Sequence, residues 1–513
     1  MTEIVTKIRK GKFHTDSIPP NSIAVIETNG DCLIKRFSDP SSTIESLSTQ
    51  DHASVGPFAK TFFIKVIGIS GDTTLTIRNS SPKKKVDNHI YNILNYGATG
   101  GDDDSLAVES AVISASLNGG GTVYFPPGTW RIQDVTVKSK VRFAGANWDS
   151  TRVSPVVGST VAMFRYKESN VCSMTGWEDM YMRGLGTTEV DAIDMSSASE
   201  WVFSTNSGLK IELFKTGIVG AQQDRRPYFY GCNFWENDIG YFTNGDHTQF
   251  LKCDFRRNRI GLSGQAMYDV QITDCSFVRN DYGILPNGTI QQSQITASHF
   301  FANVFGGAFV DDRCTFSNCL VTASAGMDAT SYGIYFNGSR SSWLGGTVES
   351  ESGTSGFGDY AFIIDAPQDC SIRNTVFDID NFARTEPARA TYRRLNFSGN
   401  TGVVRGKFLD LQVGANGFQG TQITDNNIES AAASTLLTTG DAMIEIDLSN
   451  ALYSNRISGN TFYTDTAAYL AHSLKINANG CIVKDNMARG TAGFNLTATN
   501  ADTVDVNNIH KPR

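Results

Sequence analysis

A short pattern of apolar and polar positions recurs four times between residues 232 and 306. Each copy reads C/S-x-F-x-x-N-x-x-G, as in CDFRRNRIG, which begins at Cys253. Three columns of the pattern advance together by 21, 22 and 23 residues: Phe234, Phe255, Phe277 and Phe300; Asn237, Asn258, Asn280 and Asn303; and Gly240, Gly261, Gly283 and Gly306. A period this short predicts one coil of a β-solenoid per copy, because it is too short for a pair of helices.

Stacked coils about 4.8 Å apart would place each column in register. We expect the phenylalanines to fill the interior, the asparagines to hydrogen-bond along the stack and the glycines to supply positive φ at a turn. Cys232, Cys253 and Cys275 hold an inward position and are predicted to be a buried thiol stack. Looser copies such as IRNTVFDID (372–380) and ISGNTF (457–462) extend the prediction toward the C-terminus.

The stretch from Tyr91 to Ile132 predicts how the solenoid begins. A strand over 91–94 leads into a Gly/Asp turn, and Asp104 or Ser105 is expected to cap a helix that ends near Leu117. The apolar face of this helix is predicted from Leu106, Val108, Ala111, Val112, Ala115 and Leu117. The end of a solenoid exposes apolar surface, so we expect this helix to cover it.

The string YGATGGDDDS, followed by GGGTVYFPPGTW, resembles the opening of the pectate-lyase-like right-handed parallel β-helix superfamily. With the β-rich pattern of residues 1–82 and the linker SSPKKK before it, the chain is similar to a bacteriophage tailspike or capsule depolymerase. The resemblance implies an all-β, right-handed, single-stranded β-helix that forms homotrimers. It also implies binding, and usually cleavage, of a bacterial surface polysaccharide, either capsule or O-antigen.

The predicted domains are a virion-attachment domain and linker (1–85), the start of the β-helix with its capping helix (86–145), and a shaft that carries the receptor-binding or catalytic surface (146–513). The resemblance implies that the first domain binds a phage tail or baseplate protein. The expected location is the virion tail, acting outside the cell at the host surface after folding in the host cytoplasm.

Composition excludes several classes of partner and site. A net charge of −8 argues against nucleic acid, and no run of 18 apolar residues is present to cross a membrane. The N-terminus lacks the apolar core of a secretory signal. Nine cysteines and seven histidines show no zinc spacing, so we predict no metal and no cofactor.

The candidate catalytic residues come from two segments, GTVESES (346–352) and NTVFDID (374–380). If Val348 stacks on Phe377, Glu349 lies beside Asp378 and Glu351 beside Asp380, all on one outer face. Repulsion between the four carboxylates should raise at least one pKa. Hydrolysis of a glycosidic bond needs two carboxylates, about 5–5.5 Å apart for retention or 6.5–9.5 Å for inversion.

In this hypothesis Glu349 or Glu351 protonates the leaving oxygen, and Asp378 or Asp380 activates water or attacks directly. Trp343 and Tyr335 are candidate sugar platforms, although core filling or a subunit contact explains each equally well. The acids also have a plain explanation, because outward acids are common on strands of an acidic protein.

Two other functions stay open. The outward row Asn233, Asp254, Ser276 and His299 could serve a polysaccharide lyase, with His299 or Tyr268 as base and Arg256 or Arg257 binding a uronate. A binding-only adhesin would need no catalytic carboxylate. Elsewhere, Glu178 and Asp179 in GWEDMYMRG are expected to be turn acids, and the arginines of DFRRNR a solvated turn or a subunit bridge.

Overall fold

The computed structural model divides the chain into two compact units, Met1–Asn88 and His89–Arg513. It describes residues 89–511 except for 187–188, 325–326, 329, 352–359, 367, 388–390, 413–416, 431–440, 448–454, 465–469, 478–480, 491–492 and 498–503; before residue 89 it describes only the backbone of eight strands. The predicted linker SSPKKK lies outside the described residues.

The first unit is β-rich, and its described strands pair antiparallel in two sheets. One sheet has the order β1-β8-β3-β6 and the other β2-β7-β4-β5. The strands are β1 (Glu3–Ile8), β2 (Phe13–Ile18), β3 (Ser22–Thr28), β4 (Cys32–Arg36), β5 (Glu45–Leu47), β6 (His52–Val55), β7 (Phe62–Gly68) and β8 (Thr73–Asn79).

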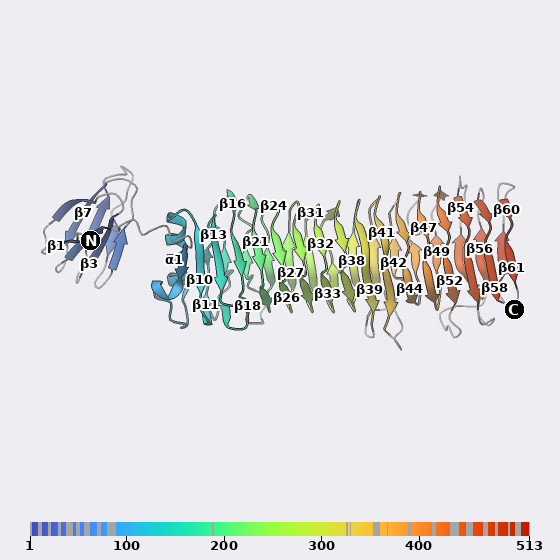
Figure 1. Cartoon of the computed structure of the whole chain (residues 1–513), viewed down its shortest axis with the longest axis horizontal. Helices are drawn as coiled ribbons and strands as arrows, with labels where there is room; N and C mark the ends of the chain where they lie inside the picture. The colour runs from blue at the N-terminus through green and yellow to red at the C-terminus, as the bar shows by residue number, and fades with distance from the viewer. Residues whose placement is uncertain are drawn as a thin grey trace. The chain divides into compact units, whose positions relative to one another are not determined.

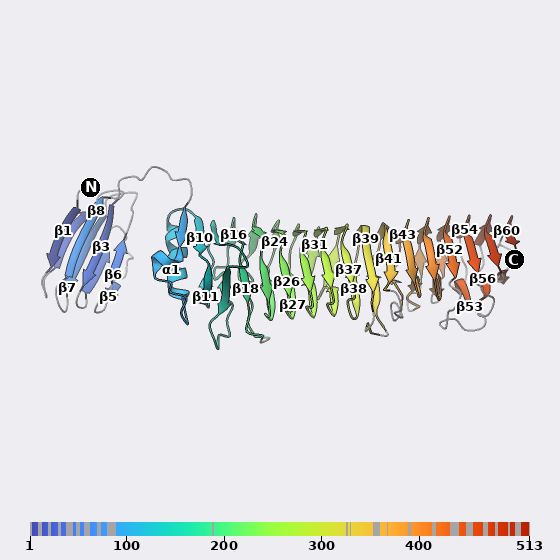
Figure 2. The same cartoon turned by 60° about the horizontal axis from the view of Figure 1, so that its bottom comes forward.

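The second unit is a parallel β-solenoid, which confirms the predicted fold class (Figures 1 and 2). A typical coil places β28 (Gln249–Leu251) on a first side, β29 (Asp254–Arg256) on a second and β30 (Ile260–Gly264) on a third. Each strand pairs in parallel with the same strand of the next coil, as β29 does with β33 (Ser276–Val278). Identical positions of successive coils therefore become lateral neighbours.

The aromatic and amide columns are stacked as the sequence predicts. The rings of Phe234, Phe255, Phe277 and Phe300 lie 4.8, 4.8 and 4.9 Å apart and nearly parallel. Asn258 Oδ1 accepts from Asn237 Nδ2 at 3.1 Å, and the same bond links Asn258 to Asn280 and Asn280 to Asn303 at 3.0 Å. The amide ladder satisfies buried polar groups at the turn between the second and third sides.

The glycine column has a different cause from the one predicted. None of its members has positive φ; at the turn that conformation belongs to Glu236, Arg257, Arg279 and Ala302. A Cβ on Gly261 would instead lie 2.6 Å from the carbonyl oxygen of Gly283, so close packing of coils requires glycine. Tyr282 pairs with Gly306, which leaves Gly283 opposite Gly307; the column therefore continues through Gly307.

The capping helix α1 (Ser105–Leu117) lies at the first coils of the solenoid, as Figures 1 and 2 show. Asp104 is its N-cap residue, but its carboxylate accepts from the backbone N–H of Thr99 instead of from the helix. The buried face consists of Ala107, Val108, Ala111, Val112 and Ala115. Leu106 and Leu117 were predicted on this face but are exposed, because at 3.6 residues per turn both lie on the side of the helix opposite Val108.

The strand predicted over 91–94 is shorter. It is β9 (Ile90–Asn92), and a 3₁₀ turn, η1 (Ile93–Tyr96), follows it because the Asn92 side chain accepts from the Leu94 N–H and closes the turn.

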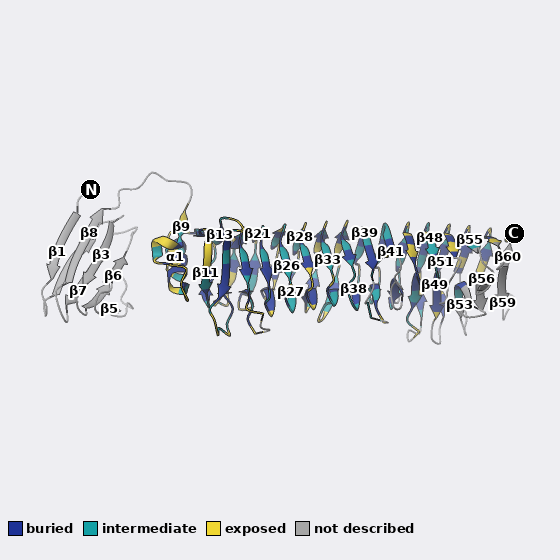
Figure 3. Ribbon diagram, turned by 90° about the horizontal axis from the view of Figure 1, so that it is seen from below, coloured by how far each residue is buried: buried dark blue, intermediate teal, exposed yellow. Residues whose placement is uncertain are grey.

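Burial alternates along many strands of the second side, as in β29, whereas the third-side strand β30 is buried throughout (Figure 3). Cys232, Cys253 and Cys275 are buried free thiols, as predicted. Burial raises the pKa of Cys253 well above its ordinary value, so this thiol stays protonated and acts as a small apolar group.

Candidate functional site

The predicted register of the two acidic segments is present on the second side of the solenoid. β41 (Ser342–Ser350) pairs with β44 (Val376–Ile379), which sets Val348 beside Phe377 and Glu349 beside Asp378. Val348 and Phe377 are buried, so the two acids point outward. The strand spacing of about 4.8 Å separates their backbones, while Glu349 contacts Thr322 of the preceding coil and Asp378 contacts Arg405 of the following one.

Glu349 joins a polar chain that the sequence did not reveal. Its Oε1 accepts from Thr322 Oγ1 at 3.4 Å, and Thr322 Oγ1 lies 3.1 Å from His299 Nε2. Thr322 belongs to β39 (Thr315–Ala323), the strand between β41 and β37 (His299–Phe301). Burial lowers the pKa of His299, partly offset by the charge of Glu349, which favours a neutral imidazole near pH 7.

Asp378 and Asp380 share one arginine. Arg405 Nη2 lies 2.6 Å from Asp378 Oδ1, and Arg405 Nη1 lies 3.7 Å from Asp380 Oδ1. The Asp378 side chain is 60% exposed, whereas that of Asp380 is 5% exposed. Burial raises the pKa of Asp380 to about 6, Arg405 lowers it, and the neighbouring charge of Asp378 contributes a smaller increase.

The structure thus alters two details of the acidic cluster. A pKa is raised, as expected, but desolvation is the main cause and like-charge repulsion the lesser one. Asp380 is buried beside Arg405, so it is far less accessible to solvent than the exposed Asp378. The pairing of β41 with β44 ends at Glu349 and Asp378, before Glu351, which is exposed and receives a hydrogen bond from Ser324 Oγ. We call Glu349, Asp378 and Asp380, with His299, Thr322 and Arg405, the carboxylate strip.

Neither predicted sugar platform lies at this strip. Trp343 is fully buried and packs against Phe316 and Phe362 at 5.9 and 5.2 Å, so it fills the core and presents no face to a sugar. Tyr335 belongs to β40 (Tyr332–Phe336) on the third side and stacks on Phe309 at 4.8 Å. Its half-buried ring is therefore on a different side from the acids.

The outward row Asn233, Asp254, Ser276 and His299 is in register as predicted. Tyr268 is not next to His299 at the end of this row, because it lies on β31 (Ala266–Tyr268), a strand at the corner before the first side. The predicted base candidates His299 and Tyr268 are therefore held on different parts of the coil.

Two of the three arginines of DFRRNR, Arg257 and Arg259, bind acids of the preceding coil, whereas Arg256 contacts Asp254 of its own strand. Arg257 Nη1 lies 3.2 Å from Glu236 Oε1, and Arg259 Nη2 lies 3.1 Å from Asp238 Oδ2. Asp179 occupies a turn at φ 54°, as expected of a turn acid. Glu178 is instead on a strand, β17 (Gly176–Glu178), where Arg142 holds it at 2.9 Å.

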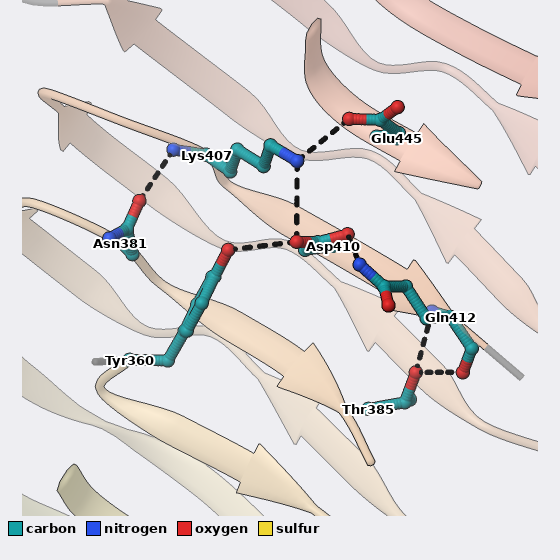
Figure 4. Close-up of polar contacts among 7 residues, drawn as sticks. All are labelled: Tyr360, Asn381, Thr385, Lys407, Asp410, Gln412 and Glu445. Carbon is teal, nitrogen blue, oxygen red and sulfur yellow. Dashed lines mark hydrogen bonds and ion pairs between the residues drawn. The ribbon is translucent and has the colours of Figure 1, made fainter. Parts of the chain in front are cut away.

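A second charged cluster lies on the third side, on strands β45 (Ala383–Thr385), β49 (Leu409–Gln412) and β53 (Asp441–Asp447) and their turns (Figure 4). Lys407 Nζ lies 3.3 Å from Asp410 Oδ2 and 2.7 Å from Glu445 Oε2, and Tyr360 OH donates to Asp410 at 3.0 Å. The acids raise the pKa of Lys407 despite its burial. These mutual contacts indicate a cluster that ties coils together.

In the part of the chain that the structure describes, no group of three or more His, Cys, Asp or Glu side chains is arranged to hold a metal ion. Within the same residues, no helix is long and apolar enough to cross a membrane.

Comparison with known proteins supports the fold, whereas the sequence similarity covers only short segments. No protein-family model matches the chain. Two mannuronan C5-epimerases of Azotobacter vinelandii match short segments: AlgE6 is 32% identical over 117 residues and AlgE1 33% over 107 residues. These segments cover 20% and 18% of this chain, and only 13% and 8% of the epimerases.

Among solved structures, the tailspike protein of E. coli bacteriophage HK620, a mutant in complex with a pentasaccharide, is similar with a TM-score of 0.54. The alignment covers 81% of this chain and 80% of the tailspike at 11% identity. The resemblance of the chain to phage tailspikes is therefore confirmed at the level of the fold.

Proposed function

We propose that this protein is a phage tailspike that binds and hydrolyses a bacterial surface polysaccharide at the carboxylate strip. The observation that carries the proposal is the contrast between two neighbouring acids. Asp380 holds a proton up to about pH 6, while Asp378 beside it is exposed and paired with Arg405. Two carboxyl groups with different environments on adjoining positions are what acid–base cleavage of a glycosidic bond requires.

The roles follow from these environments. Asp380 is the proposed general acid, because a group with a pKa near 6 can still donate a proton near neutral pH. Asp378 and Glu349, on adjacent coils, are the candidates for the base or nucleophile. Arg405 orients Asp378, and Thr322 orients Glu349. This assignment differs from the sequence-based one, in which Glu349 or Glu351 supplied the proton.

The biological setting is part of the same proposal. The tailspike and epimerase similarities both concern proteins whose names or bound ligands involve polysaccharides or oligosaccharides. The tailspike similarity supports a location on the virion tail. The proposal further includes a homotrimer that residues 1–85 attach to a tail or baseplate protein.

Lyase chemistry is the second candidate, and His299 favours it. This half-buried histidine is neutral near pH 7 and connects through Thr322 to Glu349. A neutral imidazole can remove the C5 proton of a uronate, and the matched epimerases are named for a C5 reaction on mannuronan.

One assay separates the possibilities. The protein is incubated with purified capsular polysaccharides and O-antigens from a panel of strains, and both reducing ends and the ultraviolet absorbance of unsaturated uronates are recorded. Hydrolysis yields reducing ends without the absorbance, elimination yields both, and a binding-only adhesin yields neither. The proposal fails if no polysaccharide is cleaved, or if Asp380→Asn and Glu349→Gln variants cleave as fast as the parent.

A further inference from the structure

A hollow of about 280 Å³ lies on the second side, several coils before the carboxylate strip. It is lined by Trp148, Asp149, Lys210, Asn233, Phe234, Trp235, Asp254 and Arg256. Trp148 and Asp149 come from the turn before β14 (Thr151–Pro155), and they reach residues of β26 (Asn233–Trp235), three strand pairings further along the stack. This turn therefore lies along the outer surface of the solenoid and forms one wall of the hollow.

The hollow combines aromatic faces with hydrogen-bonding groups. Trp148 is 39% exposed, and Trp235 points outward from its strand. Lys210 Nζ lies 4.6 Å from the Trp235 ring centroid and 4.5 Å from that of Tyr181, between the two rings. Arg256 Nη2 lies 3.3 Å from Asp254 Oδ2. The lining thus offers apolar faces, donors and acceptors within one small volume.

One acceptor and one donor in this lining lack partners. Asp254 Oδ1 and Trp235 Nε1 are both buried with no hydrogen-bond partner among the described residues. A buried polar atom without a partner costs about 1–3 kcal/mol, so such atoms are usually satisfied by a ligand or water. A hydroxyl group suits either atom, because it donates to a carboxylate and accepts from an indole N–H.

These observations point to a saccharide. A pyranose ring has apolar C–H faces and a rim of hydroxyl groups, which matches indole faces surrounded by donors and acceptors. We infer that the hollow is a sugar-binding subsite that holds the same polysaccharide chain whose cleavage is proposed at the carboxylate strip. This inference rests on the proposed function and adds where the chain lies and how long it must be.

The register sets the length of the bound chain. Arg256, Val278, Phe301, Thr322 and Glu349 occupy one outward column on consecutive coils. Four strand steps separate Arg256 from Glu349, or about 19 Å at 4.8 Å per step. Phe301 lies between them as a partly exposed ring. A polysaccharide that contacts both places must therefore run along the solenoid axis on the second side.

The test uses the full-length protein and the same purified capsular polysaccharides and O-antigens, immobilised on an array. For a polysaccharide that the parent binds, Trp148→Ala should weaken binding about tenfold, the loss expected for one stacked aromatic contact. Asp254→Asn should weaken it two- to tenfold, because one hydroxyl partner is lost. Tyr230→Ser removes an exposed aromatic side chain on the first side and is the matched control, expected to bind like the parent.

Cleavage kinetics distinguish this inference from the proposed function. On the long polymer, Trp148→Ala should raise KM with kcat unchanged, whereas Asp380→Asn should lower kcat and leave array binding intact. Fragments too short to span the 19 Å should be cleaved equally by the parent and Trp148→Ala. The inference is overturned if no polysaccharide on the array is bound, or if Trp148→Ala and Asp254→Asn bind like Tyr230→Ser. Binding through the hollow without cleavage would instead refute only the hydrolase.

Discussion

At the residue scale, the account depends on carboxyl groups whose surroundings differ. Asp380 is buried beside Arg405, Asp378 is exposed on the same strand end, and Asp224 is buried in the core of another coil. The sequence showed which acids share a face, because outward positions alternate along a strand. It could not show that Asp380 is buried, or that Arg405 of the next coil lies against both Asp380 and Asp378.

Asp380 gives a prediction about pH and activity. A general acid must be protonated, so kcat/KM for the cleaved polysaccharide should fall as pH rises through about 6. Asp380→Asn should reduce kcat about 100-fold or more and abolish that limb. Glu429 is an exposed acid two coils beyond Asp378 in the same outward column. The Glu429→Gln variant is the control and should keep the parent's dependence of kcat/KM on pH.

Asp224 gives a prediction about pH and stability. It lies on β24 (Asp224–Arg225), fully buried, and accepts hydrogen bonds from Tyr241 OH and Thr243 Oγ1 at 2.9 and 2.6 Å. Burial raises its pKa to about 6, above the unfolded value of about 3.9, so the folded state retains a proton that the unfolded state has lost. This contribution to stability is present at low pH and disappears as pH rises through 6.

Between pH 4.5 and pH 7.5 the effect should lower the free energy of unfolding by about 2 kcal/mol. Asp224→Asn should remove that pH-dependent part, as measured by denaturant unfolding of both proteins at the two pH values. An equal stability difference between parent and variant at both pH values would contradict the assignment.

At the element scale, each coil is held to the next by columns, and the columns were the most predictable feature. The regular steps of 21 to 23 residues made the phenylalanine and asparagine stacks visible in the sequence. The reason for the glycines was not visible, because sequence shows where a glycine occurs but not whether φ or a close approach requires it. Trp148 was missed because it lies in a turn, outside any repeat.

The amide ladder can be broken at one position. Asn258→Ala would remove the acceptor of Asn237 and the donor to Asn280 and to the Phe234 carbonyl. Because these groups are buried, unfolding should become easier by about 3 kcal/mol. Asn233→Ala, at an outward position of the neighbouring strand, should change stability by less than about 0.5 kcal/mol in the same thermal or denaturant scan.

The two kinds of glycine predict opposite tolerance to alanine. Gly261→Ala would place a Cβ 2.6 Å from a backbone oxygen, so the coils must separate and the soluble yield should fall sharply. Gly231 has φ 58° and no atom within 4 Å of its ideal Cβ position. Gly231→Ala should lower the free energy of unfolding by only about 1–2 kcal/mol. The melting temperatures of the two variants test this prediction, and an equal decrease in both would contradict it.

At the scale of the whole molecule, the central claim is that one side of the solenoid binds and cleaves a polysaccharide. Assembly is a separate prediction: light scattering of the purified protein should give three times the mass of one chain. A monomer in dilute solution would contradict the proposed trimer. The proposals for the carboxylate strip and the hollow would then still be tested by their own variants.

The measurement that tests the central claim most directly is a crystal structure of the Asp380→Asn variant with an oligosaccharide of the cleaved polysaccharide. We predict sugar density along the second side, from the hollow at Trp148 to the strip, with a glycosidic oxygen within hydrogen-bond reach of residue 380. Sugar bound only to the first or third side, or at a subunit boundary away from Glu349 and Asp378, would contradict the account.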